Sequence, residues 1–366
     1  MAAPKFNIEQ LARNGSSLSV VEQTANITSL PGLEILNRMP IKSVKLADGT
    51  EHHFLYTFSD GRTSYEPIHE VRQYQPRTKK VHERAVMSTV PWMTGLSGHH
   101  ESLNEEAIAN RLVSVSVSRE KTSAIKALQH IGHTSLAQEA WIQLLVHEDL
   151  AGRGLFMQEE LTGTGYSLAA IILNGVAAQA KMRGTNLVHG EALDPGPATK
   201  LKPEELYLHS LTQGAGRELK ELYGVLKMSD KEERKRLLKT FPFSVRHILQ
   251  NFDLFIALTA TGESARLAAA VPHDTSLNIT MFKGFKFNQR GLYKQIFTNH
   301  PNVRITEEDG CHFSGAHPMW RKLMIGRIAL VQRELEAGIP AAEIDHAVID
   351  KKIRSKLAKD KTIKKL

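Results

Sequence analysis

The chain has 366 residues, 41% hydrophobic and 23% charged, a balance typical of a globular protein with a substantial core. Its single cysteine, Cys311, excludes an intrachain disulfide, and the apolar run over 168–180 is too short to span a bilayer. The N-terminus lacks the apolar run of a signal peptide, so we expect a cytoplasmic protein, although one released by cell lysis would have the same pattern.

Positive charge is concentrated at the C-terminus. Residues 350–366 hold eight basic and two acidic residues, a net charge of +6, which leaves +2 of the total of +8 for the rest of the chain. A body so close to neutrality is not typical of a nucleic-acid-binding surface. A basic run of this kind is more often a solvated, fraying helix end, but it can also contact nucleic acid, anionic lipid or another polyanion.

The first elements in chain order are β-strands. Residues 1–40 are weakly helical and are interpreted as an N-terminal extension. Two alternating runs then flank Asp48-Gly49, which predicts a β-hairpin. A polar stretch over 65–83 follows, and the apolar run over 85–93 predicts a buried strand.

Strands and helices alternate in the middle of the chain. Residues 113–117 predict a strand, and residues 135–150 predict an amphipathic helix with Ser135 as its N-cap. A short strand then leads to a turn at Ser167, followed by a buried helix over 168–180 and a strand over 186–192.

The remaining elements continue this alternation after a long helical insertion over 202–270. Strand patterns at 277–287 and 303–306 enclose a short helix at 291–297, and a long helix starts near Pro318. Such an alternation with short connections predicts a parallel sheet with helices on both faces. The opening hairpin would be its antiparallel edge, and the insertion would rise above the sheet as a cap.

Three short motifs point to chemistry. G-Y-S-L-A at 165–169 is one methyl group away from G-x-S-x-G, the strand-to-helix turn that holds a nucleophilic serine. T-G-L-S-G at 94–98 follows the third strand, and G-C-H-F at 310–313 follows the last one. In this order of parts, the chain resembles the α/β-hydrolases over roughly residues 41–335.

The resemblance implies an α/β-hydrolase-like fold: a mostly parallel sheet flanked by helices, an antiparallel N-terminal hairpin, and a helical cap inserted between strands 6 and 7. It also implies a division of the chain into an extension, a core in two parts, a cap and a basic helical tail. The expected bounds are 1–40 for the extension, 41–200 and 271–335 for the core, 201–270 for the cap, and 336–366 for the tail.

Ser167 is the nucleophile that the resemblance implies. A serine hydroxyl becomes nucleophilic when a neighbouring base accepts its proton, and small residues two before and two after the serine permit the tight turn. The backbone N–H groups of Leu168 and Leu96 would stabilise a developing oxyanion. From the residues alone, Ser167 could equally be the N-cap of a plain helix, and 94–98 could be a plain glycine turn.

By the same resemblance, His312 is the general base, and His317 is its rival. The usual position of the acid, near Asn288, has no carboxylate, whereas L-D-P-G-P at 193–197 matches a subset of lipases that place the acid after the sixth strand. We therefore nominate Asp194, with Glu191 and Asp274 as alternatives. Asp194 could instead be a turn residue that bonds its own backbone.

These observations predict a serine hydrolase, similar to esterases and lipases, that cleaves an ester or related acyl bond through a Ser-His-Asp triad. The alternative is a catalytically degraded scaffold with a binding or structural role. It is favoured by the polar strand Q-E-E-L-T-G-T at 158–164, by Thr94 in place of a family histidine, and by the missing acid. We expect a small-molecule ester or acyl substrate and possible homo-oligomers, and neither a cofactor nor a metal, because His99 and His100 have no further ligand at metal spacing.

Overall fold

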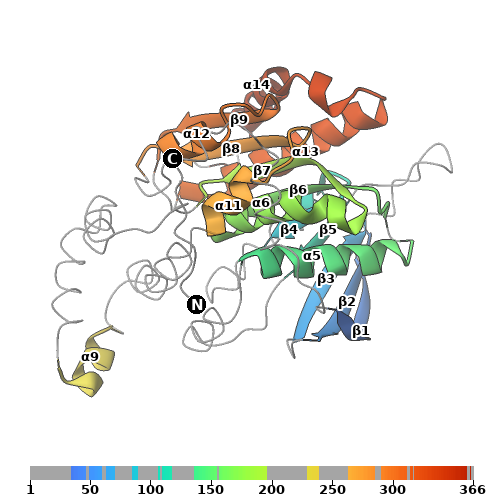
Figure 1. The fold of residues 1–366 in the computed structure, drawn as a ribbon, viewed down its shortest axis with the longest axis vertical. Coiled ribbons are helices and arrows are strands. Elements are labelled where there is room, and N and C mark those ends of the chain that lie inside the picture. The colour runs from blue at the N-terminus through green and yellow to red at the C-terminus, as the bar shows by residue number, and fades with distance from the viewer. Residues whose placement is uncertain are drawn as a thin grey trace.

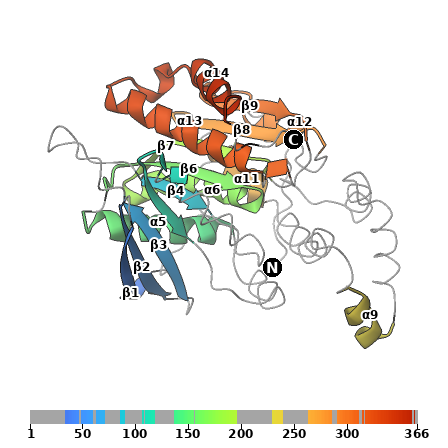
Figure 2. The ribbon, with the colours of Figure 1, turned by 180° about the vertical axis from the view of Figure 1, so that it is seen from behind.

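The computed structural model describes residues 34–46, 49–59, 63–70, 85–89, 106–107, 109–117, 136–154, 156–195, 229–238, 263–284, 290–310, 314–315, 317–360 and 363. They form one nine-stranded sheet in the order β1-β2-β3-β5-β4-β6-β7-β8-β9, with helices on both faces (Figures 1 and 2). The strands are β1 (Ile35–Leu46), β2 (Gly49–Phe58), β3 (Thr63–Glu70), β4 (Ala85–Thr89), β5 (Val113–Val117), β6 (Glu160–Tyr166), β7 (Asn186–Leu193), β8 (Ser276–Phe282) and β9 (Val303–Glu308). The helices are α5 (Leu136–Ala151), α6 (Leu168–Ala180), α9 (Lys231–Leu238), α11 (Glu263–Ala269), α12 (Arg290–Ile296), α13 (Pro318–Glu336) and α14 (His346–Leu357), with 3-10 turns at Lys181–Arg183 and Ala341–Glu343.

The strand directions confirm the predicted fold class. β1, β2 and β3 pair antiparallel, and β3 joins β5 in the same way. Every pair from β5 through β4, β6, β7 and β8 to β9 is parallel. The sheet is therefore mostly parallel, is flanked by helices and has an antiparallel N-terminal part, as an α/β-hydrolase-like fold requires.

The N-terminal part differs from the prediction in two places. β1 starts at Ile35, inside the segment expected to be an extension, and pairs with β2 as the hairpin predicted at Asp48-Gly49 requires. β3 forms over 63–70, largely within the stretch interpreted as polar and irregular, and pairs with β2 along its whole length. Backbone pairing with a neighbouring strand holds such a polar segment in the sheet, and local sequence does not reveal that partner. With this additional strand, the predicted insertion lies between β7 and β8.

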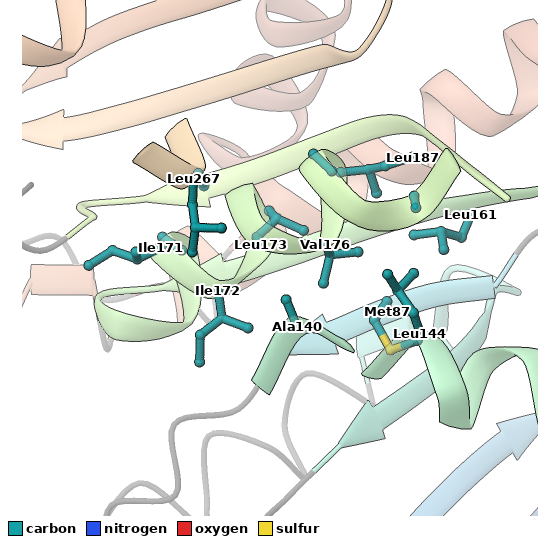
Figure 3. Packing of buried hydrophobic residues seen from close by; sticks show 14 of the residues in the cluster. Met87, Ala140, Leu144, Leu161, Ile171, Ile172, Leu173, Val176, Leu187 and Leu267 are labelled. Atoms are coloured by element: carbon teal, nitrogen blue, oxygen red, sulfur yellow. The ribbon is translucent and has the colours of Figure 1, made fainter. Parts of the chain in front are cut away.

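One face of the sheet is covered by α5, α6, α11 and α12 over an apolar core (Figure 1). Figure 3 shows Leu173 and Val176 of α6 among side chains of the neighbouring strands and helices. A Cβ atom at Gly175 would lie 2.9 Å from the Cβ of Ala140 and 3.3 Å from the Cδ1 of Leu267, so glycine lets α5 and α11 approach α6 closely. α11, at the end of the segment expected to be the cap, thus belongs to this helical layer. Apart from 229–238 and 263–270, the segment 201–270 lies outside the described residues.

The opposite face of the sheet packs against α13 and α14 (Figure 2). Here two of the polar residues of β6 that argued for a degraded scaffold, Thr162 and Thr164, are fully buried and bonded. Thr162 accepts a hydrogen bond from Gln332 at 2.9 Å, and Thr164 lies 3.4 Å from the sulfur of Met324. The polarity of β6 therefore reflects a polar contact with α13 rather than a strand exposed to solvent.

The C-terminal segment is docked, which overturns the expectation of a solvated, fraying helix end for the residues of α14. Ile349 and Ile353 are buried against α13, where Gly326 leaves room for the Ile353 side chain. Asp345 caps the helix by accepting from the backbone N–H groups of Ala347 and Val348. Ile349 and Ile353 form an apolar stripe at helical spacing, but the prediction for this segment was based on its high net charge. Among the residues that the structure describes, no helix is long and apolar enough to cross a membrane.

Candidate active site

Ser167 lies in the turn between β6 and α6, with an unusual backbone conformation. Its φ is 60° and its ψ is −122°, and its backbone N–H donates to the carbonyl of Leu193 at the end of β7, at 2.9 Å. A non-glycine residue in such a sparsely populated region costs about 1–3 kcal/mol and persists only where its surroundings impose it. Strain of this kind is typical of a strand-to-helix turn that presents a nucleophile.

The neighbours of Ser167 explain why the turn needs small residues. A Cβ atom at Gly165 would lie 2.4 Å from the carbonyl oxygen of Ala169 and 2.8 Å from the amide nitrogen of Ala170, closer than van der Waals contact allows. The side chain of Ser167 makes no cap hydrogen bond to α6. The plain alternative, a helix capped by the serine hydroxyl, requires that bond.

Asp194 lies directly after β7, next to Leu193, whose carbonyl holds the Ser167 turn. It is fully buried, and its carboxylate Oδ1 accepts from the backbone N–H of Phe282 at the end of β8, at 3.0 Å. The carboxylate therefore reaches toward the neighbouring strand, not only its own turn. Burial, and to a smaller extent the negative charge of Asp194, raises the pKa of the Tyr293 phenol.

His312 lies outside the described residues, as does Leu96, but the chain on both sides of 311–313 is described. Gly310 has a φ of 132°, and its carbonyl accepts from the N–H of Gly284, 2.9 Å away. A Cβ atom there would lie 2.8 Å from the Oγ of Ser314, so the two ends of the segment are in contact. This conformation and this spacing both require glycine.

The chain after 311–313 returns to the nucleophile strand. A Cβ atom at Gly315 would lie 2.4 Å from the Cε2 of Tyr166, so the backbone of Gly315 packs directly on the ring of the residue before Ser167. Since β7 and β8 separate β6 from β9, the chain leaving β9 has crossed back over two strands to make this contact. Sequence reasoning missed the contact, and the only signal for it was an unassigned glycine.

The three alternative site residues have other roles. His317 caps α13, with its Nδ1 accepting from the N–H of Met319 at 3.2 Å. Asp274 lies just before β8, at the amino ends of the parallel strands, whereas Ser167 lies at their carboxyl ends. Asp274 pairs with Lys181 at 2.7 Å. Glu191 lies in the middle of β7 and is held by three neighbouring side chains.

These neighbours of Glu191 form a buried polar cluster between the sheet and α13. Its carboxylate accepts from Asn278 at 2.9 Å and from Arg327 at 3.2 Å, and contacts the Nε2 of His189 at 3.0 Å. Burial by itself raises the pKa of Glu191, but the charge of Arg327 and the bonds from His189 and Asn278 hold it below its ordinary value. A charged Glu191 is therefore part of the folded core.

The same cluster continues into α14. Ser276 bridges the Nδ1 of His189 and the Nε2 of His346, each at 2.9 Å. Burial, followed by the nearby His189, lowers the pKa of His346 to about 4, so His346 is neutral at pH 7. Alternating polar residues in β7 and β8 were the available signal for this cluster. Within the described part of the chain, no three His, Cys, Asp or Glu residues gather as metal ligands do.

Comparisons with known proteins place the backbone beside esterases at low identity. No family model and no curated protein matches the sequence. Solved structures similar to this chain include an esterase from Pyrococcus furiosus, with 9% identity and a TM-score of 0.46 over 84% of this chain and 98% of that one. Others are a thermostable esterase from Pseudomonas putida (12% identity, TM-score 0.42, 93% of both chains) and a fungal esterase from Rhizomucor miehei (13%, 0.45, 91% and 92%). With identities and TM-scores this low, function has to be inferred from the residues of this chain.

Proposed function

We propose that this protein is a serine hydrolase that cleaves an ester or a related acyl bond of a small molecule, with Ser167 as the nucleophile. The observation that carries the proposal is the strained turn of Ser167, which lies over a glycine that no larger residue can replace. A plain helix start would relax to ordinary dihedral angles, because nothing would select for the strain.

In this mechanism, His312 accepts the proton of the Ser167 hydroxyl as the oxygen attacks the acyl carbon. The tetrahedral oxyanion receives hydrogen bonds from the backbone N–H groups of Leu168 and Leu96. His312 then gives its proton to the leaving alcohol, and the acyl group stays on Ser167. A water molecule, deprotonated by His312, attacks the acyl-enzyme, and the acid is released with the serine hydroxyl restored.

Asp194 is the proposed acid that orients His312 and stabilises its charged form. Three contacts support this arrangement: Ser167 is tied to Leu193, the carboxylate of Asp194 reaches the end of β8, and Gly315 lies on Tyr166. These contacts join the carboxyl ends of β6 to β9. The proposed triad residues follow three of these strands: Ser167 follows β6, Asp194 follows β7 and His312 follows β9. The roles are those of a Ser-His-Asp triad, in which the carboxylate orients the histidine and the histidine activates the serine.

The test is labelling with a fluorophosphonate probe, followed by peptide mass spectrometry and an assay on short p-nitrophenyl esters. We expect the probe on Ser167, and Ser167→Ala should lose about 10⁴-fold or more in activity. Ser355→Ala, an exposed serine on α14, is the matched control and should keep full activity. A Ser167→Ala variant that retains a tenth of the activity would show that another residue is the nucleophile.

The acid is tested by Asp194→Asn, which keeps an oxygen to accept from the N–H of Phe282 and removes only the charge. The expected loss in kcat is about 10⁴-fold, with little change in KM or in the melting temperature. If neither probe labelling nor ester cleavage is seen in the folded wild-type protein, the degraded-scaffold alternative replaces the proposed function.

A further inference from the structure

The docked helix α14 divides its side chains by charge. Ile349 and Ile353 face α13 and are buried, while the side chains of Lys351, Lys352 and Lys356 are exposed. On a helix of 3.6 residues per turn, Lys351 lies opposite the two isoleucines, whereas Lys352 and Lys356 lie at the border of the isoleucine stripe. The body of the protein therefore holds α14 in one orientation, with its lysines turned outward.

The acidic residues of this segment are already paired with cations of α13 and of α14 itself. Asp350 accepts from Arg327 at 2.9 Å and from Arg354 at 2.8 Å, and Asp360 pairs with Lys322 at 2.6 Å. Arg354 also pairs with Glu308 at the end of β9. Both negative charges of the run thus point toward the body and are paired.

The outward lysines, in contrast, have no counter-charge. Across the described parts of the chain, the ammonium groups of Lys351, Lys352, Lys356 and Lys359 have no ion-pair or hydrogen-bond partner. Lys352 and Lys356 are four residues apart, about 6 Å along the helix axis, and Lys359 lies in the turn directly after α14. We call these four side chains the lysine face.

We propose that the lysine face binds the phosphate backbone of nucleic acid without sequence preference. Lysine binds phosphate as a compact point charge, and contacts of this kind position a protein on nucleic acid without reading the bases. The chain outside residues 350–366 carries only +2 of the total charge of +8, so binding is centred on the lysine face and depends strongly on salt.

An anionic bilayer fits the lysine face less well. A helix that lies in a membrane interface buries an apolar face among the lipids, but the apolar stripe of α14 is already buried against α13. Val348, 60% exposed, is the only exposed large hydrophobic side chain of α14 among its described residues. The remaining exposed positions of the helix offer charge without an apolar anchor.

The experiment measures fluorescence anisotropy of a labelled 20-base-pair DNA duplex of arbitrary sequence between 50 and 200 mM salt. The logarithm of the association constant should fall linearly with the logarithm of the salt concentration, with a slope of roughly −0.9 for each phosphate contacted. The triple variant Lys351→Gln, Lys352→Gln, Lys356→Gln should reduce the magnitude of that slope by roughly 2.7 and weaken binding at 50 mM salt by tenfold or more.

The matched control removes the same charge from lysines that already have carboxylate partners: Lys181→Gln, Lys283→Gln and Lys294→Gln. It should leave the slope unchanged. Equal weakening by both triple variants would overturn the proposal, because net charge and not the lysine face would then be responsible. Binding to phosphatidylserine vesicles with no binding to the duplex would also overturn it, and would assign the face to a lipid surface.

Discussion

Arg327→Met should destabilise the protein strongly, because it leaves the charge of Glu191 buried without a counter-charge. The side chains of Arg327 and Glu191 are 4% and 1% exposed, and their ion pair spans 3.2 Å between α13 and β7. Methionine keeps the length and apolar character of the arginine stem, so the lost interaction is mainly electrostatic. Removing one partner of a buried pair typically costs about 3–5 kcal/mol.

The stability of the wild type and that of Arg327→Met should change differently with pH. In the wild type, Arg327 helps to hold the pKa of Glu191 below its ordinary value, so the contribution of Glu191 is present at neutral pH and is lost as the pH falls below about 4. Without Arg327, burial raises that pKa. Glu191 then takes up a proton on folding, and the variant should recover part of its stability between pH 7 and pH 5 while the wild type does not.

Urea denaturation at pH 7 and pH 5, followed by tryptophan fluorescence, measures both effects. Arg236→Met is the control, because Arg236 and its partner Glu233 lie on the exposed surface of α9, and no measurable change is expected. A loss of free energy of unfolding below about 1 kcal/mol, or an equal loss at both pH values, would refute a charged Glu191 held by Arg327.

Three further substitutions test the geometry. Gly165→Ala places a methyl group against the backbone of α6 and should destabilise by about 1–3 kcal/mol with loss of probe labelling, whereas Gly291→Ala, which meets nothing within 4 Å, should do neither. Gly315→Ala overlaps the buried ring of Tyr166, so it should slow labelling of the serine and destabilise by about 1–3 kcal/mol. Ile353→Ala should cost about 2–5 kcal/mol in a urea titration if α14 is docked, and almost nothing if the helix is solvated.

Much of the fold could be predicted from local patterns. The helix over 168–180, the strands at 113–117 and near 186–192, and the proline at the start of α13 all agree with the structure. These elements have a clear period or a clear start signal, which depend only on residues close in sequence. The turn motif at 165–169 belongs to the same class, since the need for small residues is local.

β3 and α14 could not be predicted in this way. β3 is a strand because β2 lies beside it, and α14 is docked because Gly326 and Arg327 of α13 receive Ile353 and Asp350. In both segments the stabilising partner is remote in sequence, and charge or polarity dominates the local pattern. A hydrophobic pattern interrupted by lysines is compatible with either a solvated or a docked helix.

The candidate site divides in the same manner. The sequence by itself determined the residue types and the order of the strand-to-helix turn at Ser167, the carboxylate after β7 and the histidine after β9. Only the tertiary structure decided that Glu191 and Asp274 face other partners, and that Gly315 returns to Tyr166 beside the serine. The physical reason is that a backbone period extends over a few residues, whereas burial and counter-charges depend on segments that meet only when the sheet has formed.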